Sequence, residues 1–390
     1  MGGMNVETSK KVLHVVPGFG SNGTLGGAER AVYDIVRGLA RSGAYAPILC
    51  VLRRAAPPAD LELEGIEVLT LHFTGPDRDF ELLTRCAGQL RAMIKRIQPA
   101  LVHSHLWTAA AVSGCALKGL GIPHVIHIHD TRSWLISKQL RHRVRRALNR
   151  WMLGRSVRFI ACAKAVRDFT RDRFLPSADI EVIHYGIDAA RFIRPGDRPA
   201  PGNAGRTVGT AARLRPEKGL EALLAACRQV HDEGLAFRLK VAGGGRRLAY
   251  YREEVQRAGL SGVADFLGPV ADMPSFFSGL DVFVLPSLAT EGLPISMLEA
   301  MASELPVVAT AIAGTPEAVT DGEEGFLVPP NDIPALAAAM KKLLSDPPRA
   351  REMGRKARAR IERFFARERM VEGVLRYYDT IPGLRNRAGS

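Results

Sequence analysis

The sequence predicts an α/β protein made of two doubly wound parallel-sheet domains that face a cleft. Apolar strand-like segments alternate with helical patterns from one end of the chain to the other. Many of these segments are continuous apolar runs, such as 280–285, and strands buried on both faces have this pattern. A length of 390 residues, 46% of them hydrophobic, suits two domains that each bury a core.

Strands are expected throughout the chain. In the first half they are expected at 11–16, 46–52, 66–72, 100–104, 123–128, 157–162 and 180–184. In the second half they are expected at 206–210, 236–242, 264–268, 281–286, 305–309 and 325–328. The boundary is expected in 194–206, where six residues are Pro or Gly. Residues 334–379 predict mostly helix, interrupted near Pro347 and Pro348.

Composition and cysteine spacing indicate the compartment. The five cysteines are scattered and form no CxxC pair, which argues against a disulfide framework or a zinc ribbon and favours a reducing environment. The first apolar run is too short for the core of a signal peptide. No apolar stretch approaches the roughly 20 residues that a spanning helix needs. We therefore expect a cytoplasmic protein, or one held peripherally on the inner face of the cytoplasmic membrane.

The net charge of +14 is concentrated in residues 131–173, which contain thirteen Lys/Arg and two Asp. Within this segment, apolar residues recur every four positions and predict one apolar stripe along a basic helix at 135–153. The stripe consists of Ile136, Leu140, Val144, Leu148 and Met152. The opposite face carries Lys138, Arg141, Arg145, Arg146 and Arg150.

Two interpretations of this helix remain open. The stripe packs on its own domain and leaves the basic face solvated, or the basic helix contacts an anionic membrane surface or a phosphorylated acceptor. No nucleic-acid-binding motif accompanies the patch, so we expect no nucleic-acid partner.

A glycine-rich segment follows the first expected strand. It runs from Pro17 to Arg30, and a helix is expected to begin near Ala28. Glycines such as Gly26 and Gly27 allow close backbone approach to a ligand, and a helix N-terminus favours an anion. The spacing matches neither a dinucleotide fingerprint nor a phosphate loop, so a flexible turn remains an alternative.

A second loop places two cations after the first strand of the second half. Arg213 and Lys218 lie on this loop, and a helix is expected near Gly219. A guanidinium and an ammonium that converge at a helix N-terminus suit a diphosphate. Taken singly, each could be a solvated loop charge.

Two glutamates flank a further helix start. Glu291 lies on the loop after strand 281–286, Pro294 fits the first helical turn, and Glu299 lies about one and a half turns into the helix. The two could be catalytic carboxylates, hydroxyl-binding groups or ordinary surface charge.

Histidines end two strands of the first half. His103 and His105 end one strand, while His127 and His129 end another and should point together because alternate strand residues share a face. They could form a metal site or include one substrate-facing histidine, but no further ligand spacing supports a metal. The Asp-x-Asp at 77–79 also offers a metal–nucleotide site, although Asp79 as a helix N-cap explains it more simply.

Taken together, these motifs resemble the retaining, nucleotide-sugar-dependent glycosyltransferases called family 4, or group 1. The resemblance covers nearly the whole chain. The similar segments are 26–30, 213–219, the Glu-x7-Glu segment 291–299 with its internal Gly-Leu-Pro, 300–308 and 325–330.

The resemblance implies the GT-B fold, which pairs two Rossmann-like domains. The acceptor-side domain would comprise 1–195 together with a C-terminal helix at about 370–390 that crosses back to it. The nucleotide-sugar-binding domain would comprise 196–369, and residues 263–272 would approach the base.

The resemblance also implies a role for each matched residue. Arg213 and Lys218 would neutralise the departing diphosphate. Glu299 would accept hydrogen bonds from the ribose. Glu291 would bind hydroxyls of the transferred sugar, and His129 would serve as the donor-sugar and acceptor-side histidine. The backbone amides of Gly26, Gly27, Gly292 and Leu293 would complete the donor site.

The implied reaction moves a hexosyl group from a nucleotide-diphosphate sugar to a hydroxyl of a glycan or lipid-linked acceptor, in polysaccharide or lipopolysaccharide synthesis. A UDP-sugar is the favoured donor and a GDP-sugar the next. Because cations at the leaving group stabilise its charge, no metal and no other cofactor is expected. A His-x-His metal-dependent hydrolase remains the alternative function.

Three positions depart from the family pattern. His184 to Asp188 stands where many members have Asn before Gly, Ala313-Gly314 stands where a double glycine is common, and Ala163 replaces a frequent serine. None of them touches the phosphate or glutamate motifs.

Overall fold

The computed structural model describes residues 9–18, 26–53, 65–73, 80–153, 157–192 and 206–384. The chain forms two compact units, one made of Met1–His184 with Glu368–Ser390 and the other of Tyr185–Arg367. Each unit is built around one parallel sheet, so the predicted two-sheet α/β class is confirmed. Among the described residues, no helix is both long and apolar enough to cross a bilayer.

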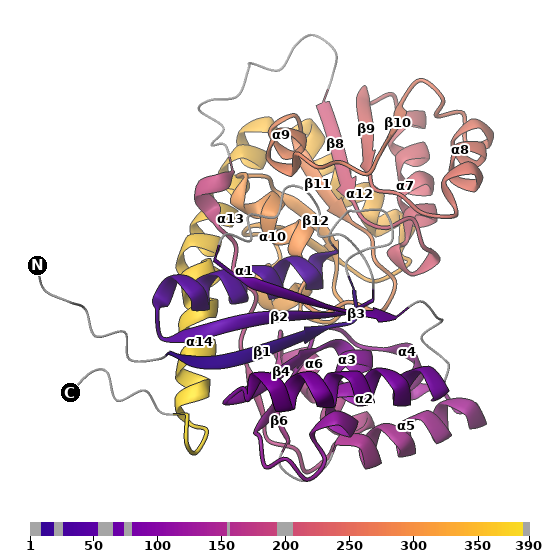
Figure 1. Ribbon diagram of the computed structural model, residues 1–390. Coiled ribbons are helices and arrows are strands. Elements are labelled where there is room, and N and C mark those ends of the chain that lie inside the picture. The colour runs from indigo at the N-terminus through magenta and orange to yellow at the C-terminus, as the bar shows by residue number, and fades with distance from the viewer. Residues whose placement is uncertain are drawn as a thin grey trace, which may run out of the picture. The chain divides into compact units, whose positions relative to one another are not determined.

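The first unit contains a seven-stranded sheet with the order β3-β2-β1-β4-β5-β6-β7. Its strands are β1 (Lys10–Val16), β2 (Tyr45–Arg53), β3 (Glu67–Phe73), β4 (Leu101–His105), β5 (His124–Ile128), β6 (Val157–Ala161) and β7 (Ile180–Val182). Its helices are α1 (Gly27–Ser42), α2 (Phe80–Ile97), α3 (Leu106–Leu117), α4 (Ser133–Ile136), α5 (Leu140–Leu153), α6 (Lys164–Arg173) and α14 (Arg367–Asp379), which begins at the last residue of the second unit. Helices lie on both sides of this sheet (Figure 1).

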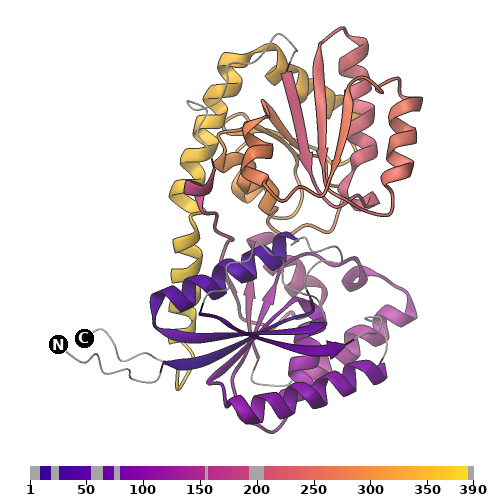
Figure 2. The same cartoon turned by 45° about the horizontal axis from the view of Figure 1, so that its top comes forward.

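The second unit contains a six-stranded sheet with the order β10-β9-β8-β11-β12-β13. Its strands are β8 (Arg206–Ala211), β9 (Phe237–Ala242), β10 (Ala264–Gly268), β11 (Val282–Leu285), β12 (Val307–Thr310) and β13 (Gly325–Val328). Its helices are α7 (Leu220–Asp232), α8 (Leu248–Arg257), α9 (Met273–Ser278), α10 (Ile295–Ala302), α11 (Thr315–Ala318), α12 (Ile333–Ser345) and α13 (Pro347–Phe364), with short 3-10 turns η1 (Ala189–Arg191) and η3 (Pro216–Lys218). Figure 2 shows the strands of this sheet between helices.

Every expected strand has a counterpart within two residues at each end. The agreement has a physical cause, because strands of a parallel sheet covered by helices on both faces must be apolar throughout. The central strand β11 shows this, since all four of its residues are buried. In each sheet the strand order reverses beside the first strand of the unit. This reversal places the loop after β1 next to the loop after β4, and the loop after β8 next to the loop after β11.

The C-terminal helix α14 packs on the first unit. Its Tyr378 hydroxyl lies 2.6 Å from Nδ1 of His103 on β4, and Tyr377 donates to the Phe159 carbonyl of β6 at 3.1 Å. A Cβ on Gly38 of α1 would lie 2.3 Å from a methyl of Val371, so α1 and α14 approach at a glycine. The last described residues are held as well, because Lys10 Nζ donates to the Leu384 carbonyl at 3.2 Å.

The two units divide at His184–Tyr185 rather than at the expected 195–196. The segment after Tyr185 is held by the end of α13, since the amide of Ile187 donates to the Phe365 carbonyl at 2.7 Å. Asp188 also forms an ion pair with Arg367 at 2.7 Å. Residues 193–205, which include most of the Pro- and Gly-rich segment, lie outside the described residues.

The basic segment differs from the expected single helix with a covered apolar stripe. It forms two helices, α4 and α5, and of the five stripe residues only Met152 is buried. The polar face instead packs on the unit. Arg146 donates to the carbonyls of Trp134 and Ser137 at 3.0 and 2.9 Å, and Arg150 donates to the Phe174 carbonyl. Of the two interpretations left open, the structure contradicts the one in which the stripe packs on its own domain. Periodicity identifies a face of a helix, but it does not identify what covers that face.

Candidate functional site

The loop between β8 and α7 carries the two predicted cations of the second unit. It passes through the 3-10 turn η3 and reaches α7 at Gly219, whose φ of 68° is left-handed. A Cβ on Gly219 would lie 1.9 Å from the Pro286 carbonyl oxygen, so only glycine allows this loop to touch the chain that leaves β11. The amide of Leu288 donates to the Glu217 carbonyl at 2.8 Å, which fixes the two loops together.

This loop brings Lys218 against Glu291. Lys218 Nζ donates to Oε1 of Glu291, and the Ser287 hydroxyl donates to the same oxygen at 2.6 Å. Ser287 is itself anchored, because the Thr310 hydroxyl at the end of β12 donates to its carbonyl at 2.6 Å. The carboxylate of Glu291 is therefore held by contacts that come from the ends of three neighbouring strands, β8, β11 and β12.

Arg213 lies on the same loop and is exposed. Within the described part of the chain its guanidinium makes neither a hydrogen bond nor an ion pair, so its donors are available to an anion. The structure thus places the two predicted cations at one end of β8, with one engaged by a carboxylate and the other open.

Two residues near Glu291, Thr290 and Ala313, have a left-handed backbone conformation. Thr290 has a φ of 59°, which is unusual for a β-branched residue and costs of order 1–3 kcal/mol. On the far side, the Gly314 amide donates to the Gly292 carbonyl at 2.8 Å, and Ala313 has a φ of 47°. Ala313 therefore adopts a conformation that the family's more common glycine would adopt without strain. The expectation that the departure at Ala313-Gly314 does not touch the glutamate motif was therefore wrong, because the fold brings the loop after β12 against Gly292.

Glu299 lies in the fifth position of α10 and is 5% exposed. The helix begins at Ile295, and Pro294 occupies the N-cap position, one residue earlier than its expected place in the first turn. Gly292 and Leu293 lie directly before this helix start and are buried. The segment 291–299 therefore gathers two carboxylates and a helix N-terminus in one place.

The loop after β9, which no sequence motif above pointed to, also belongs to this region. Gly243, Gly244 and Gly245 follow that strand, and a Cβ on Gly243 would lie 1.9 Å from the Ala212 carbonyl oxygen. The Leu214 amide donates to the Gly244 carbonyl at 3.0 Å. The sequence feature that could have identified this loop is the run of three glycines directly after the expected strand 236–242.

The expected base-binding segment 263–272 contains β10 and its following loop. Leu267 is 46% exposed, and the Gly268 carbonyl accepts a hydrogen bond from the Gly243 amide at 2.7 Å. This segment therefore lies beside the glycine loop after β9.

In the first unit, Gly26 and Gly27 form the start of α1. Gly26 is the N-cap with extended backbone, and a Cβ there would lie 2.2 Å from Oε2 of Glu29. Residues 19–25 of the glycine-rich segment lie outside the described residues, as do Asp77 and Asp79.

Five histidines cover one face of the first sheet. His14 on β1 is in register with His103 on β4, and His105 is in register with His127 on β5. His129 follows β5, and its ring stacks on that of His127 with centroids 4.4 Å apart, so the expectation that these two point together is confirmed. His14 was not singled out in the sequence analysis, because its strand contains no second histidine.

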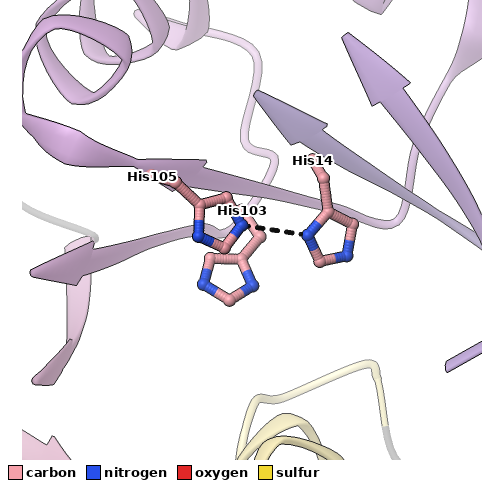
Figure 3. A group of neighbouring side chains, drawn as sticks. All are labelled: His14, His103 and His105. Carbon is pink, nitrogen blue, oxygen red and sulfur yellow. Dashed lines mark hydrogen bonds between the residues drawn. The ribbon is translucent and has the colours of Figure 1, made fainter. Parts of the chain in front are cut away.

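Hydrogen bonds link three of these rings in a chain. His14 Nδ1 lies 3.1 Å from His105 Nε2, and His105 Nδ1 lies 3.2 Å from His129 Nε2. Figure 3 shows the first of these contacts, with the ring of His103 beside it. Nε2 of His14 is buried and has no partner among the described residues.

Because Nε2 of His14 has no partner among the described residues, we can assign which nitrogen carries the proton in each of the three linked rings. A buried N–H without an acceptor costs more than a buried lone pair without a donor, so we assign the His14 proton to Nδ1. His14 then donates to His105, and His105 donates to His129. This leaves the His129 proton on Nδ1, so that ring acts as a hydrogen-bond donor through Nδ1.

All five rings are neutral near pH 7. Burial lowers the pKa of His14 and of His127 to about 3. Burial, followed by repulsion from neighbouring histidines, holds the pKa values of His103 and His105 well below the usual 6.5. For His129, burial is again the main cause of a pKa well below 6.5.

Two trios within this cluster have nitrogens close enough to share a metal ion. They are His14, His103 and His105, and His105, His127 and His129, each with nitrogens within 4.8 Å. Three neutral imidazoles are a known zinc ligand set, so both trios fit zinc by residue type. In each trio one pair of nitrogens is already joined by a hydrogen bond, His14 with His105 and His105 with His129.

Two family models match the chain. The model described as Glycosyltransferase Family 4 matches residues 25–191, and the model described as Glycosyl transferases group 1 matches residues 199–360. The two matches follow one another along the chain and together include every strand of the two sheets except β1.

The chain is also similar to individual proteins whose names describe sugar-transferring enzymes or a complex with UDP and glucose. A glycogen synthase of Mycobacterium tuberculosis is 28% identical over 380 residues, covering 91% of each chain. A GDP-mannose-dependent alpha-(1-6)-phosphatidylinositol monomannoside mannosyltransferase of Mycolicibacterium smegmatis is 37% identical over 215 residues, covering 48% of this chain and 54% of its own. The structure of Anabaena HepE in complex with UDP and glucose superposes with a TM-score of 0.79 at 22% identity, covering 95% of this chain and 100% of that one.

Proposed function

Because the chain belongs to glycosyltransferase family 4 and has the GT-B fold of a nucleotide-sugar-dependent glycosyltransferase, we propose that it transfers a hexosyl group from a nucleotide-diphosphate sugar to an acceptor hydroxyl. A UDP-sugar is the favoured donor and a GDP-sugar the next. The acceptor is a glycan or a lipid-linked glycan. Family membership also favours this reaction over the metal-dependent hydrolase.

The observation that carries the proposal is the arrangement around Lys218. A cation already paired with a buried carboxylate, Glu291, lies on the same short loop as the exposed cation Arg213. The buried carboxylate of Glu299 lies in α10, about one turn after the start of the helix that follows Glu291. Two cations suit a diphosphate, and two carboxylates suit the hydroxyls of the sugar and the ribose on either side of it.

The chemistry follows from the charges that develop. Breaking the bond between the anomeric carbon and the phosphate oxygen leaves its electron pair on the diphosphate and positive charge on the sugar. Arg213 and Lys218 would stabilise the diphosphate, since preorganised cations are most effective where charge appears. Glu291, oriented by Ser287, would hold a sugar hydroxyl and favour the positive sugar.

We further propose that the reaction retains the anomeric configuration. Within the described residues around Glu291 the one carboxylate on the loop is engaged by Lys218 and Ser287, which leaves it poorly suited to attack carbon. The acceptor oxygen would instead attack from the face that the diphosphate leaves, and its proton would pass to the departing phosphate oxygen. NMR of the product would test this proposal, because an inverted anomeric centre contradicts it.

The donor can be identified by a screen of thermal shift and hydrolysis across UDP-, GDP- and ADP-sugars. Binding and hydrolysis of one UDP-sugar is the expected outcome. The relatives include a GDP-mannose-dependent enzyme and the solved structures include a complex with UDP and glucose, so both bases belong in the screen. Absence of binding and hydrolysis with every nucleotide sugar would contradict the proposed function.

The reaction should require no metal. Treatment with a chelator is expected to leave turnover unchanged, and elemental analysis is expected to find no stoichiometric zinc in the histidine cluster. Loss of turnover that zinc or magnesium restores would show that a metal takes part. We place the reaction in cell-surface polysaccharide or lipopolysaccharide synthesis, on the inner face of the cytoplasmic membrane.

A further inference from the structure

Large apolar side chains on α5 face solvent. Leu140 is 73% exposed, Val144 50%, Leu148 36% and Trp151 65%, and Ile136 at the end of α4 is 54% exposed. These five account for most of the large exposed hydrophobic side chains in the described residues; the others are Tyr250, Leu267 and Phe364. We call these five residues the α5 stripe; it differs from the predicted stripe because the exposed Trp151 takes the place of the buried Met152.

The opposite side of α5 is fixed to the first unit. Asn149, Met152 and Leu153 are buried, and a Cβ on Gly114 of α3 would lie 2.3 Å from the Met152 carbonyl oxygen. Two arginines add to this attachment through carbonyl groups, as described above. The α5 stripe is therefore held outward by a rigid attachment, since spacings of four, four and three residues keep Leu140 to Trp151 on one helical face.

Positive charge borders the stripe. Helix α5 contains five arginines and no acidic residue. At about 100° per residue, Arg141 and Arg143 fall on opposite borders of the stripe, and both are exposed. Lys118 adds a further cation, with Nζ 3.0 Å from the centre of the Trp151 ring.

We propose that the α5 stripe lies in the interface of a bilayer that contains anionic lipids. An exposed apolar helical face bordered by arginines, with a tryptophan on it, is the pattern of a helix that lies flat at the headgroup level. The arginines would contact lipid phosphates while the stripe contacts the acyl boundary. A second copy of the chain is a poorer occupant, because pairing two stripes would bring the bordering arginines of both copies together.

The proposed function puts the reaction at the membrane face, and this inference adds the surface that makes the contact and the lipid charge it selects. Its test does not depend on the proposed function. Vesicle binding can be measured with neither a sugar nucleotide nor an acceptor present. Failure of the donor screen and failure of vesicle binding are therefore separate results.

The fluorescence of Trp151 can report the binding of vesicles. Trp107 and Trp134 are 5% and 7% exposed, so Trp151 is the tryptophan whose surroundings would change. With vesicles of phosphatidylglycerol and phosphatidylcholine at low salt, we expect co-sedimentation and a blue shift of tryptophan fluorescence. Raising the salt concentration should weaken binding because the lipid charge is screened. Trp151→Phe should keep binding and lose the blue shift.

Paired substitutions test the contributions of the apolar stripe and of the bordering arginines to vesicle binding separately. Leu140→Gln with Trp151→Gln should weaken binding about tenfold or more, because two apolar anchors are lost. The matched pair Tyr250→Gln with Phe364→Gln removes exposed aromatic residues of the second unit and should bind as the wild type does. Arg141→Gln with Arg143→Gln should remove the preference for phosphatidylglycerol over pure phosphatidylcholine vesicles, whereas Arg351→Gln with Arg355→Gln should keep it.

Three results would overturn the inference. These are an absence of binding to phosphatidylglycerol vesicles at low salt, binding that the Leu140 and Trp151 variant retains in full, and a dimer in vesicle-free solution that this variant abolishes. Light scattering after size exclusion would detect such a dimer.

Discussion

Lys218 and Glu291 lie 73 residues apart in the sequence and form an ion pair in which both side chains are largely buried. The side chain of Lys218 is 16% exposed and that of Glu291 is 9% exposed. The pair joins the loop after β8 to the loop after β11, so each motif positions the other. Removing one partner should therefore affect both stability and activity, because the remaining charge stays desolvated.

Replacing Lys218 with alanine should reduce kcat/KM about 10²–10³-fold, since one cation at the leaving diphosphate is lost. It should also lower stability by about 3–5 kcal/mol, because Glu291 keeps a buried charge without its partner. Steady-state kinetics and denaturant unfolding would measure the two effects.

A double variant distinguishes these effects. Lys218→Ala with Glu291→Gln should recover most of the lost stability, because no buried charge remains, while activity stays low. Lys356→Ala removes an exposed partner of Glu323 and serves as the control that should leave both unchanged. Wild-type turnover in folded Lys218→Ala would contradict the role given to the ammonium.

Glu299→Gln should reduce kcat/KM about tenfold to 10²-fold, since hydrogen bonds from ribose hydroxyls to a carboxylate are stronger than those to an amide. The variant should also discriminate less than the wild type between the natural donor and its 2′-deoxy and 3′-deoxy ribose analogues. Glu253→Gln, on an exposed face of α8, is the matched control. Undiminished discrimination in Glu299→Gln would show that this carboxylate does not contact the ribose.

Stability should fall on mild acidification. The pKa values of His14, His124 and His127 are lowered to about 3 by burial, whereas in the unfolded chain a histidine titrates near 6.5. The unfolded chain therefore takes up protons first, so stability is complete above about pH 6.5 and is lost as the pH falls toward about 3. Each such histidine should cost about 1.4 kcal/mol at about pH 5.5.

Urea unfolding at several pH values would measure this loss. His127→Gln should reduce the pH dependence, since one buried group no longer titrates. His231→Gln, on an exposed position at the end of α7, should leave it as in the wild type. Equal stability of the wild type at about pH 5.5 and at about pH 7.5 would contradict the prediction.

Ala163→Ser should stabilise the first unit. Ala163 is the N-cap of α6 with extended backbone and supplies no side-chain cap. A serine there would accept a hydrogen bond from a backbone amide of the first turn, which is worth about 1 kcal/mol. Ala165→Ser, two residues into the helix, should instead destabilise by a few tenths of a kcal/mol, at about the level of helix propensity. Thermal unfolding of the two variants should give shifts of opposite sign.

The sequence determined much of this protein by itself. Apolar runs placed the strands, because a strand covered on both faces leaves no room for polar residues. Local spacing also placed His127 beside His129. The roles that the family resemblance implies for the loop motifs at 213–219 and 291–299, a diphosphate site and two hydroxyl-binding carboxylates, stay predictions. These features depend on residues close together in the chain.

Only the tertiary structure decided which distant residues meet and which faces are covered. The pairing of Lys218 with Glu291 needed the order of strands β8, β11 and β12. The hydrogen-bond chain from His14 to His129 needed the register of β1, β4 and β5. The outward direction of the α5 stripe needed the packing of α5 on α3. The physical reason is common to all three, because periodicity defines a face of a strand or helix, whereas the neighbour of that face is set by contacts between segments far apart in the chain.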